Sequence, residues 1–264
     1  MIDSVVTPEK GTLTLALGNP VAIDACTRGS SAHADLNRSF AKSLLASSDP
    51  DSPESTRAEL LAPLLSDCDV CIDLHATNKP SVPFLRIAGK LDSRHRRIMQ
   101  WLRAPVLLAD PHHSLAGEAV TTDEYVGTQG GVGICFETGH AADTSLVGEV
   151  TTSMYALLSR ELGMLPEVPE GAGVEARLPE ETYEMREVFK LTEEGFAWAE
   201  GVGGKNFDFI PAGEPVGFVG GFDKPFTVDY DSYLIFPKIE SLWRVGAALG
   251  WLAAKQPAVL KAAL

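Results

Sequence analysis

Residues 70–77 read VCIDLHAT, an apolar run that ends in polar and ionisable side chains. The first five residues of this run, Val70–Leu74, are typical of a strand buried on both faces of a parallel sheet. Residues 132–136, VGICF, have the same character and follow the pair Gly130-Gly131. Patterns typical of helices alternate with these and other short strands, which indicates an α/β fold.

The remaining patterns divide the chain into two parts. Further strands are expected at residues 12–17 and 104–108, and helices at residues 36–46, 57–65, 91–102 and 144–162. After Gly163, residues 165–173 are rich in Pro, Glu and Gly and are typical of a linker. Beyond the linker we expect short strands at residues 183–191, 195–200, 215–219 and 233–236, and a closing helix at residues 241–263. The prediction is an α/β domain over residues 1–165 and a β-rich domain with a closing helix over residues 175–264.

Composition excludes several classes of protein. The chain has 264 residues with 22 Lys and Arg against 36 Asp and Glu, a formal net charge of −14. This acidic balance argues against a nucleic acid or an anionic membrane as partner. The four cysteines are too few for a disulfide scaffold, and no secretory signal or membrane-spanning run is recognisable. We therefore expect a cytoplasmic protein that acts on a small molecule; an oligomer is compatible with the sequence.

Ionisable residues gather at the expected strand ends, where ligands bind in open α/β sheets. His75 follows the strand at Val70–Leu74, and as an isolated residue it is either a metal ligand, a general base or a hydrogen-bonded loop histidine. Glu137 follows the strand at residues 132–136 and is either a general base or a capping or ion-paired carboxylate. Arg28 and Arg38 suit carboxylate binding, but each could equally form a surface ion pair.

The order of these segments resembles the succinylglutamate desuccinylase/aspartoacylase family, which consists of zinc-dependent amide hydrolases related to the zinc carboxypeptidases. The resemblance runs from about Gly11 to Val150 and rests on the segments GNP at 18–20, Arg28, DLNRSF at 35–40, DLHAT at 73–77 and FETG at 136–139. It implies a three-layer α/β/α zinc-peptidase-like domain with a small β-rich C-terminal domain. It also implies hydrolysis of the amide bond of an N-acyl amino acid or a related small amide, with one Zn²⁺ per chain.

The resemblance also assigns roles to individual residues. His75 is similar to the third zinc ligand of the family, and Glu137 is similar to its catalytic carboxylate. The substrate-binding residues implied in the same way are Arg28, Asn37, Arg38 and Thr77. In that scheme Arg38 binds a substrate carboxylate, and Arg28 is also catalytic because it stabilises the developing oxyanion.

One part of the family pattern is missing from this sequence. The first two zinc ligands of the family lie in a G-x-H-G-x-E loop before the GNP segment, but no His precedes Gly18 here. A catalytic zinc normally takes three protein ligands, so His75 alone is insufficient. We expect that this sequence begins downstream of the loop that carries the first two zinc ligands. The alternatives are a catalytically inactive homologue that binds a small carboxylate, ligands supplied by another chain, and a carboxypeptidase-type or amidoligase-related activity.

Overall fold

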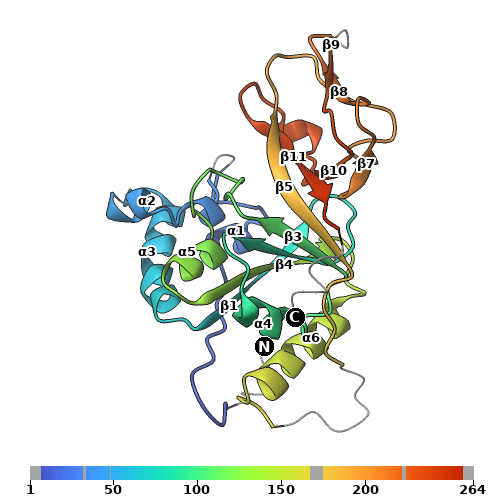
Figure 1. Ribbon diagram of the computed structural model, residues 1–264. Coiled ribbons are helices and arrows are strands. Elements are labelled where there is room, and N and C mark those ends of the chain that lie inside the picture. The colour runs from blue at the N-terminus through green and yellow to red at the C-terminus, as the bar shows by residue number, and fades with distance from the viewer. Residues whose placement is uncertain (1–6, 32–33, 48, 167–174, 222–223, 258–264) are drawn as a thin grey trace.

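The computed structural model describes residues 7–31, 34–47, 49–166, 175–221 and 224–257. Its helices are α1 (Pro20–Asp24), η1 (Leu36–Arg38), α2 (Lys42–Ala46), α3 (Pro53–Ser66), α4 (Ser93–Met99), α5 (Thr122–Thr128), α6 (Val147–Ala156), η2 (Leu157–Glu161) and η3 (Glu240–Leu242). Its strands are β1 (Val70–Thr77), β2 (Phe84–Ala88), β3 (Val106–Asp110), β4 (Val132–His140), β5 (Glu181–Lys190), β6 (Ala197–Trp198), β7 (Asp208–Ile210), β8 (Pro215–Val219), β9 (Lys224–Thr227), β10 (Ser232–Ile235) and β11 (Ala248–Lys255). Figure 1 labels most of these elements.

Within the described residues, one mixed sheet has eight strands in the order β1-β4-β2-β3-β5-β11-β10-β7. β1 and β4 are parallel neighbours, as are β2 and β3, and β3 and β5. β4 and β2 run antiparallel, and so do β5, β11, β10 and β7 from one strand to the next. The strands predicted at Val70–Leu74 and at residues 132–136 are confirmed, and both extend further into the polar residues that follow them.

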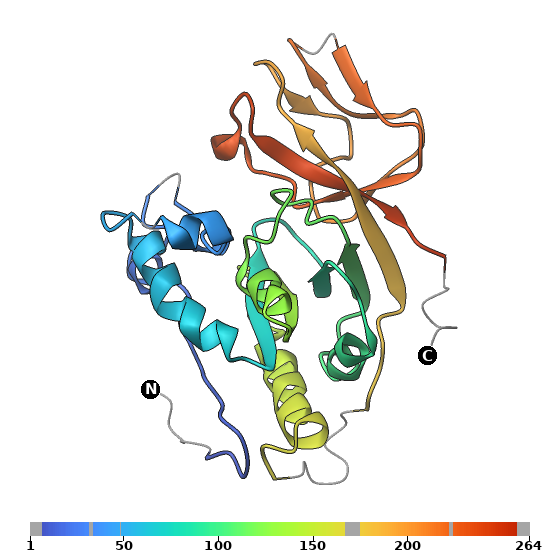
Figure 2. The ribbon, with the colours of Figure 1, turned by 60° about the vertical axis from the view of Figure 1, so that its left-hand side comes forward.

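Helices cover both faces of the first four strands of this sheet. Ile98 and Met99 of α4 pack with Ile134 and Phe136 of β4 on one face, where Leu157 of η2 joins them. On the opposite face α5 lies so close to β4 that a Cβ at Gly133 would be 1.9 Å from the carbonyl oxygen of Asp123. Figure 2 shows these layers from the side. The predicted three-layer α/β/α arrangement is confirmed.

A second region is built from strands β5 to β11. β6, β8 and β9 form a small antiparallel sheet, and an aromatic cluster that includes Phe189, Phe196 and Trp198 packs against it. The large sheet continues into this region because β5 pairs with β3 on one side and with β11 on the other. The predicted boundary therefore lies within one hydrogen-bonded sheet, and residues 167–174 of the predicted linker lie outside the described residues.

The expected closing helix over residues 241–263 is wrong in the part that the structure describes. Residues Ala248–Lys255 form β11, which pairs with β5 and β10. Its central residues are buried, and a short apolar run of this kind suits a buried strand as well as a helix. Because this segment pairs with two neighbouring strands, it forms a strand and not a helix. Residues 258–264 of the predicted helix lie outside the described residues.

Two expectations near the N-terminus are also corrected. Residues 12–17 form no strand, and Leu15 and Leu17 are 72% and 65% exposed. The alternating pattern is present, but this segment pairs with no strand in the described part of the chain. The helix expected at residues 36–46 is interrupted between η1 and α2, where the Phe40 N–H donates instead to the Val120 carbonyl oxygen, 3.1 Å away.

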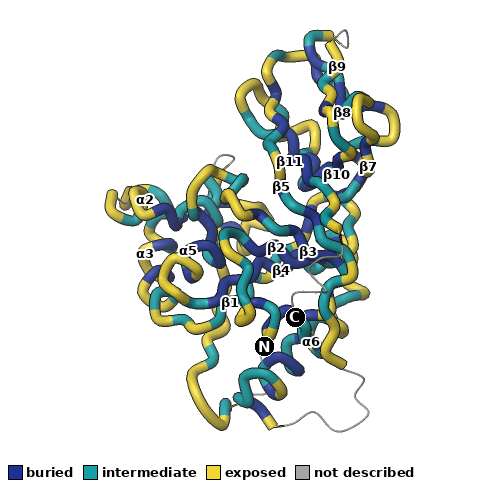
Figure 3. Tube along the Cα trace, in the orientation of Figure 1, coloured by how far each residue is buried: buried dark blue, intermediate teal, exposed yellow. Residues whose placement is uncertain are grey.

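The other helices agree with the patterns that predicted them. α3 and α4 fall at the positions expected from residues 57–65 and 91–102, and the helix expected at 144–162 begins at Val147 and ends in the π-helical turn η2. Figure 3 shows that β2, β3 and β4 are buried along most of their length. None of the helices in the described ranges is long and apolar enough to cross a lipid bilayer.

Candidate active site

The register between β1 and β4 determines which side chains lie together at the site. His75 lies opposite Glu137 in this parallel ladder, and Thr77 lies opposite His140 after an irregularity between the two positions. The Thr138 hydroxyl donates to the His75 carbonyl oxygen at 2.8 Å and ties the two strand ends together. Parallel strands end at the same edge of a sheet, so the polar residues after each apolar run meet there.

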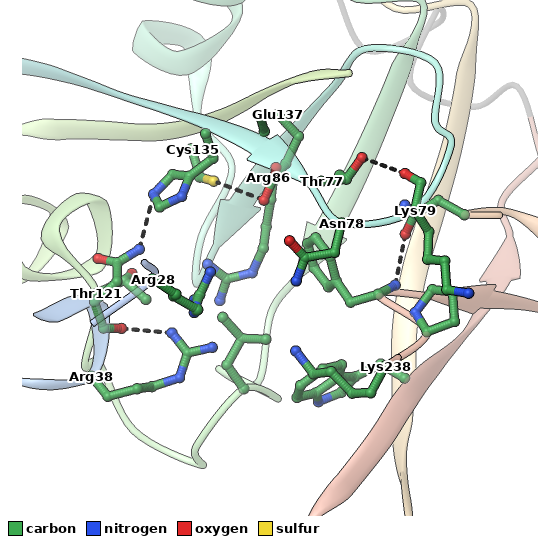
Figure 4. Close-up of a pocket in the computed structure, with 18 residues that line it drawn as sticks. Arg28, Arg38, Thr77, Asn78, Lys79, Arg86, Thr121, Cys135, Glu137 and Lys238 are labelled. Atoms are coloured by element: carbon green, nitrogen blue, oxygen red, sulfur yellow. Dashed lines mark hydrogen bonds between the residues drawn. The ribbon is translucent and has the colours of Figure 1, made fainter. Parts of the chain in front are cut away.

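All six predicted site residues line one pocket that is open to solvent (Figure 4). They are Arg28, Asn37, Arg38, His75, Thr77 and Glu137. The Thr77 hydroxyl donates to the Lys79 carbonyl oxygen at 2.6 Å, so Thr77 shapes the loop at the pocket edge. The structure thus brings together residues that lie more than 100 positions apart in the sequence.

His75 belongs to a hydrogen-bonded network with Asp73 and Asn37. Its Nε2 is 2.8 Å from Asp73 Oδ2 and 3.1 Å from Asn37 Nδ2. Asp73 also accepts from Asn37 Nδ2 at 3.2 Å and from the Thr122 hydroxyl. Burial disfavours the charged imidazole, but the negative charge of Asp73 and its hydrogen bond outweigh this effect and raise the pKa of His75 to about 9.

These residues do not fit the catalytic zinc that the family resemblance implies. In the described part of the chain, no group of three or more His, Cys, Asp or Glu side chains is arranged to hold a metal ion. His75 Nε2 is hydrogen-bonded to Asp73, which leaves Nδ1 as the ring nitrogen that could bind a metal, and a single ligand does not hold a catalytic zinc. We therefore derive no chemical step through zinc for this chain.

Glu137 is a buried carboxylate with one oxygen that makes no hydrogen bond. Its exposed fraction is 7%, and Oε2 has no partner among the described residues. Its other oxygen lies 4.0 Å from the Cys135 sulfur, a weak contact. Burial raises the pKa of Glu137, although His75 and Arg28 oppose this effect. A carboxylate with a raised pKa and an unoccupied oxygen can accept a proton from a substrate or from water.

Asp35 organises the cationic side of the pocket. Its Oδ2 accepts from Arg28 Nη2 at 3.0 Å and from Arg28 Nε at 3.3 Å, and its Oδ1 accepts from the Asn37 main-chain N–H at 3.0 Å. Arg38 Nη1 donates to the Asn37 carbonyl oxygen at 2.6 Å. Arg38 forms no ion pair with a carboxylate among the residues described. Its guanidinium is thus available to an anionic ligand.

Arg86 forms the centre of a buried ion cluster beneath the pocket. It is 1% exposed, and its Nη2 lies 2.6 Å from Asp110 Oδ2 and in contact with Glu124 Oε1. Asp123 Oδ2 is 3.7 Å from Nη1 of the same guanidinium. These carboxylates raise the pKa of Arg86 although burial opposes its charge. The sequence analysis did not single out Arg86. The feature that could have indicated a buried arginine is its position inside the apolar run FLRIA at 84–88.

The C-terminal β region completes the pocket with residues that the sequence patterns did not indicate. Asn206 donates its main-chain N–H to the Pro80 carbonyl oxygen at 2.9 Å, and its Oδ1 accepts from the Phe236 N–H at 2.7 Å. Lys238 also lines the pocket, and its Nζ lies 5.4 Å from the centre of the Trp251 ring. These positions depend on pairing of distant strands, which leaves no local signal in the sequence.

Solved structures with the same fold share this arrangement of strands and helices. A succinylglutamate desuccinylase from Vibrio parahaemolyticus is 17% identical with a TM-score of 0.68, over 91% of this chain and 70% of that one. Murine aminoacylase 3 is 20% identical with a TM-score of 0.67, over 91% of this chain and 82% of that one. A succinylglutamate desuccinylase/aspartoacylase from Rhodobacter sphaeroides is 18% identical with a TM-score of 0.63, over 91% of this chain and 74% of that one.

The fold is therefore that of these desuccinylase and aminoacylase structures, an α/β protein with an appended β region. The family model described as the succinylglutamate desuccinylase/aspartoacylase catalytic domain matches residues 5–159, and the chain belongs to this family. The family resemblance predicted from the sequence is confirmed. No curated protein matches the chain.

Proposed function

We propose that this chain binds an N-acyl amino acid in the pocket and hydrolyses its amide bond. The observation that carries the proposal is the position of Glu137, a buried carboxylate whose Oε2 makes no hydrogen bond, in the same pocket as Arg28 and Arg38. A general base needs an unoccupied oxygen, and a substrate carboxylate needs a cation. Family membership and the names of the desuccinylase and aminoacylase relatives support the same substrate class.

Each residue then has a defined task. Arg38, with Asn37 beside it, binds the substrate carboxylate. Arg28 donates to Asp35 through Nε and Nη2, which leaves Nη1 for the carbonyl oxygen of the scissile amide. Glu137 takes a proton from a water molecule while the water oxygen bonds to the carbonyl carbon.

The reaction ends with transfer of the same proton. Negative charge that develops on the carbonyl oxygen is stabilised by Arg28. The carbon–nitrogen bond then breaks, and Glu137 returns its proton to the leaving nitrogen. The products are a carboxylate and a free amine, and Glu137 regains its starting state.

A second candidate function is binding of a small carboxylate without hydrolysis. The observation that favours it is the lack of a three-ligand metal group in the described ranges. In that case the cationic side of the pocket still binds the carboxylate ligand, and Glu137 has no catalytic role.

One experiment separates the two candidates. The purified chain is incubated with N-acetyl amino acids that carry acidic, apolar or aromatic side chains, with and without added zinc, and amine release is followed. Binding of the same compounds is measured by calorimetry. Amine release that is lost in Glu137→Gln supports hydrolysis, and binding without release supports the second candidate. A chain that neither binds nor cleaves any of these compounds contradicts both.

A further inference from the structure

Arg28 lies on the loop that follows α1, and its guanidinium is only partly enclosed. The side chain is 53% exposed, although it lines the pocket and donates to Asp35. A long side chain that is this exposed loses conformational freedom when it is held in one orientation. The position of the guanidinium at the pocket therefore depends on how firmly the main chain of the loop is held.

The loop is packed on both sides of Arg28. On the N-terminal side, the Thr27 N–H donates to the Ala22 carbonyl oxygen of α1 at 2.9 Å. The Thr27 hydroxyl reaches across the arginine and donates to the Gly29 carbonyl oxygen at 2.8 Å. On the C-terminal side, a Cβ at Gly29 would lie 1.9 Å from the Ala34 carbonyl oxygen, so the two segments of main chain touch.

The next residue of the loop, Ser30, is bound by a buried carboxylate from α3. Glu54 lies in the first turn of α3 and is 2% exposed. Its Oε1 accepts from the Ser30 main-chain N–H at 2.7 Å, and its Oε2 accepts from the Ser30 hydroxyl at 2.6 Å. Oε1 also accepts from Asn19 Nδ2 at 2.8 Å, and Asn19 is the cap of α1. One carboxylate thus joins the loop to the first turns of α1 and α3.

Glu54 contacts the loop and not the pocket. Neither Glu54 nor its partners Ser30 and Asn19 belong to the pocket lining. Burial disfavours the charge of Glu54, but the hydrogen bonds from Ser30 and Asn19 outweigh this effect and lower its pKa. Hydrogen bonds to an ionised carboxylate are stronger than those between neutral groups. The loop is therefore fixed two residues after Arg28 by strong contacts that a ligand does not displace.

We propose that Glu54 is a positioning residue, which holds the loop so that Arg28 faces the scissile carbonyl oxygen. It acts through Ser30 and touches no reacting atom. This inference rests on the proposed function, which gives Arg28 the stabilisation of the oxyanion. Because that charge develops only in the transition state, a displaced loop lowers kcat and leaves KM nearly unchanged.

Four single variants test the inference. Glu54→Met removes both acceptors and keeps a side chain of similar length. Glu54→Gln keeps one oxygen for the Ser30 and Asn19 N–H groups, and its amide can donate to the Ser30 hydroxyl, so it tests rescue. Ser30→Ala removes one hydrogen bond without a change in α3. Glu59→Met is the matched control, because Glu59 is exposed on the same helix.

The expected result is a fall in kcat for amine release of about tenfold or more in Glu54→Met, since a misplaced catalytic group can cost more than this. KM should change by less than about threefold in the same variant. Glu54→Gln and Glu59→Met should stay within about threefold of the unmodified chain, and Ser30→Ala should lose about threefold or more.

A double variant separates positioning from a general effect on the fold. Arg28→Met and Glu54→Met/Arg28→Met should have the same kcat, because the loop has no arginine left to position. Losses that add in the double variant would overturn the inference. Equal kcat in a folded Glu54→Met protein and the unmodified chain would also overturn it, as would a Glu54→Gln protein as slow as Glu54→Met. Thermal melting shows which variants fold. If Glu54→Met does not, an unchanged kcat in Ser30→Ala overturns the inference.

Failure of the proposed hydrolysis gives a different result. Affinity for N-acetyl amino acids is measured by calorimetry, and exchange of the Ser30 amide hydrogen is followed by NMR without ligand. A chain that binds these compounds but releases no amine refutes hydrolysis. The inference is then retained if Glu54→Met speeds this exchange by about tenfold or more and weakens binding only when Arg28 is present. It is overturned if either effect is absent, and a chain that neither binds nor cleaves overturns both proposals.

Discussion

His75 of β1 lies directly opposite Glu137 of β4, and the two strands run parallel. Neither residue is near the other in the sequence, so the register of this one ladder brings together the two ionisable residues at the end of each strand. The positive charge of His75 opposes the rise that burial causes in the pKa of Glu137. A change at either position therefore alters the electrostatic environment of the other.

Replacement of Glu137 by Gln should lower the rate of amide hydrolysis by at least about 100-fold, because general-base catalysis contributes that much or more. The amide has nearly the same shape as the carboxylate, so the affinity for substrate should change by less than threefold. Amine release and calorimetric binding measure the two quantities. Retention of a tenth of the original rate would show that another group acts as the base.

The protein should hold less than stoichiometric zinc, because the described residues include no three-ligand group. Metal content is measured by inductively coupled plasma mass spectrometry after incubation with zinc chloride and dialysis. His75→Ala is the matched control, and its zinc content should equal that of the unmodified chain. One zinc per chain that disappears in His75→Ala would contradict this prediction.

Affinity for an anionic ligand of the pocket should fall as the pH rises through about 8, the pKa of Lys238. The charged groups around it are Arg28, Arg38, Asp35 and Glu137. Lys238 is a cation below this pH and neutral above it, so its contribution to binding is present at pH 7 and is largely lost by pH 9. The measurement is the ratio of affinities of the unmodified chain and Lys238→Met at pH 7 and 9. A ratio that does not change would contradict the assignment.

Replacement of Arg86 by Met should destabilise the fold by about 3–5 kcal/mol, because it leaves buried carboxylates without their cation. Asp110 and Glu124 both contact this guanidinium. The free energy of unfolding is measured in urea. Arg97→Met is the control, since Arg97 is 69% exposed in its pair with Glu161 and should contribute less than about 1 kcal/mol. Equal effects of the two changes would contradict the role of the cluster.

Replacement of Asp92 by Ala should destabilise the protein by about 1 kcal/mol through loss of the cap of α4. Asp92 Oδ1 accepts from the main-chain N–H groups of Arg94 and His95 at 2.9 and 3.2 Å. Asp92→Asn keeps an oxygen at the same place and should lose much less. Urea unfolding of the three proteins at pH 7 provides the comparison, and equal loss in both variants would show that the hydrogen bonds are not the cause.

The same cap gives a pH dependence with a defined sign. Burial opposes ionisation, but the hydrogen bonds from His95 and Arg94 lower the pKa of Asp92 below its usual value. The carboxylate therefore contributes stability above about pH 4, where it is ionised in the unfolded chain as well, and this contribution is lost as the pH falls toward its folded value. The stability difference between the unmodified chain and Asp92→Ala should accordingly decrease between pH 5 and 3. A difference that stays constant over this interval would contradict the assignment.

Local sequence patterns were sufficient to predict part of the fold and part of the candidate site. β1 and β4 are continuous apolar runs, and the polar residues after them, His75, Thr77 and Glu137, could be placed at one edge of a parallel sheet. Arg28 and Arg38 were singled out as cations suited to a carboxylate, the family resemblance assigned them to substrate binding, and the pocket includes all of these residues. Their catalytic and substrate-binding roles stay predictions.

The remaining features depend on contacts between distant segments. The apolar residues of β11 are compatible with a helix, and only the ladders with β5 and β10 make them a strand. Lys238 reaches the pocket because β10 and β11 pair at one register, which no local pattern encodes. Residues 12–17 show the opposite case, because their alternating pattern pairs with no strand among the described residues.

The continuity of the large sheet through β3, β5 and β11 also sets a length scale. Glu137 of β4 and the strand β10, which precedes Lys238, belong to the same hydrogen-bonded sheet. Residues from both parts of the chain therefore line one pocket. A ligand that contacts both must span the distance between them, so the length of a ligand matters for binding in addition to its charge.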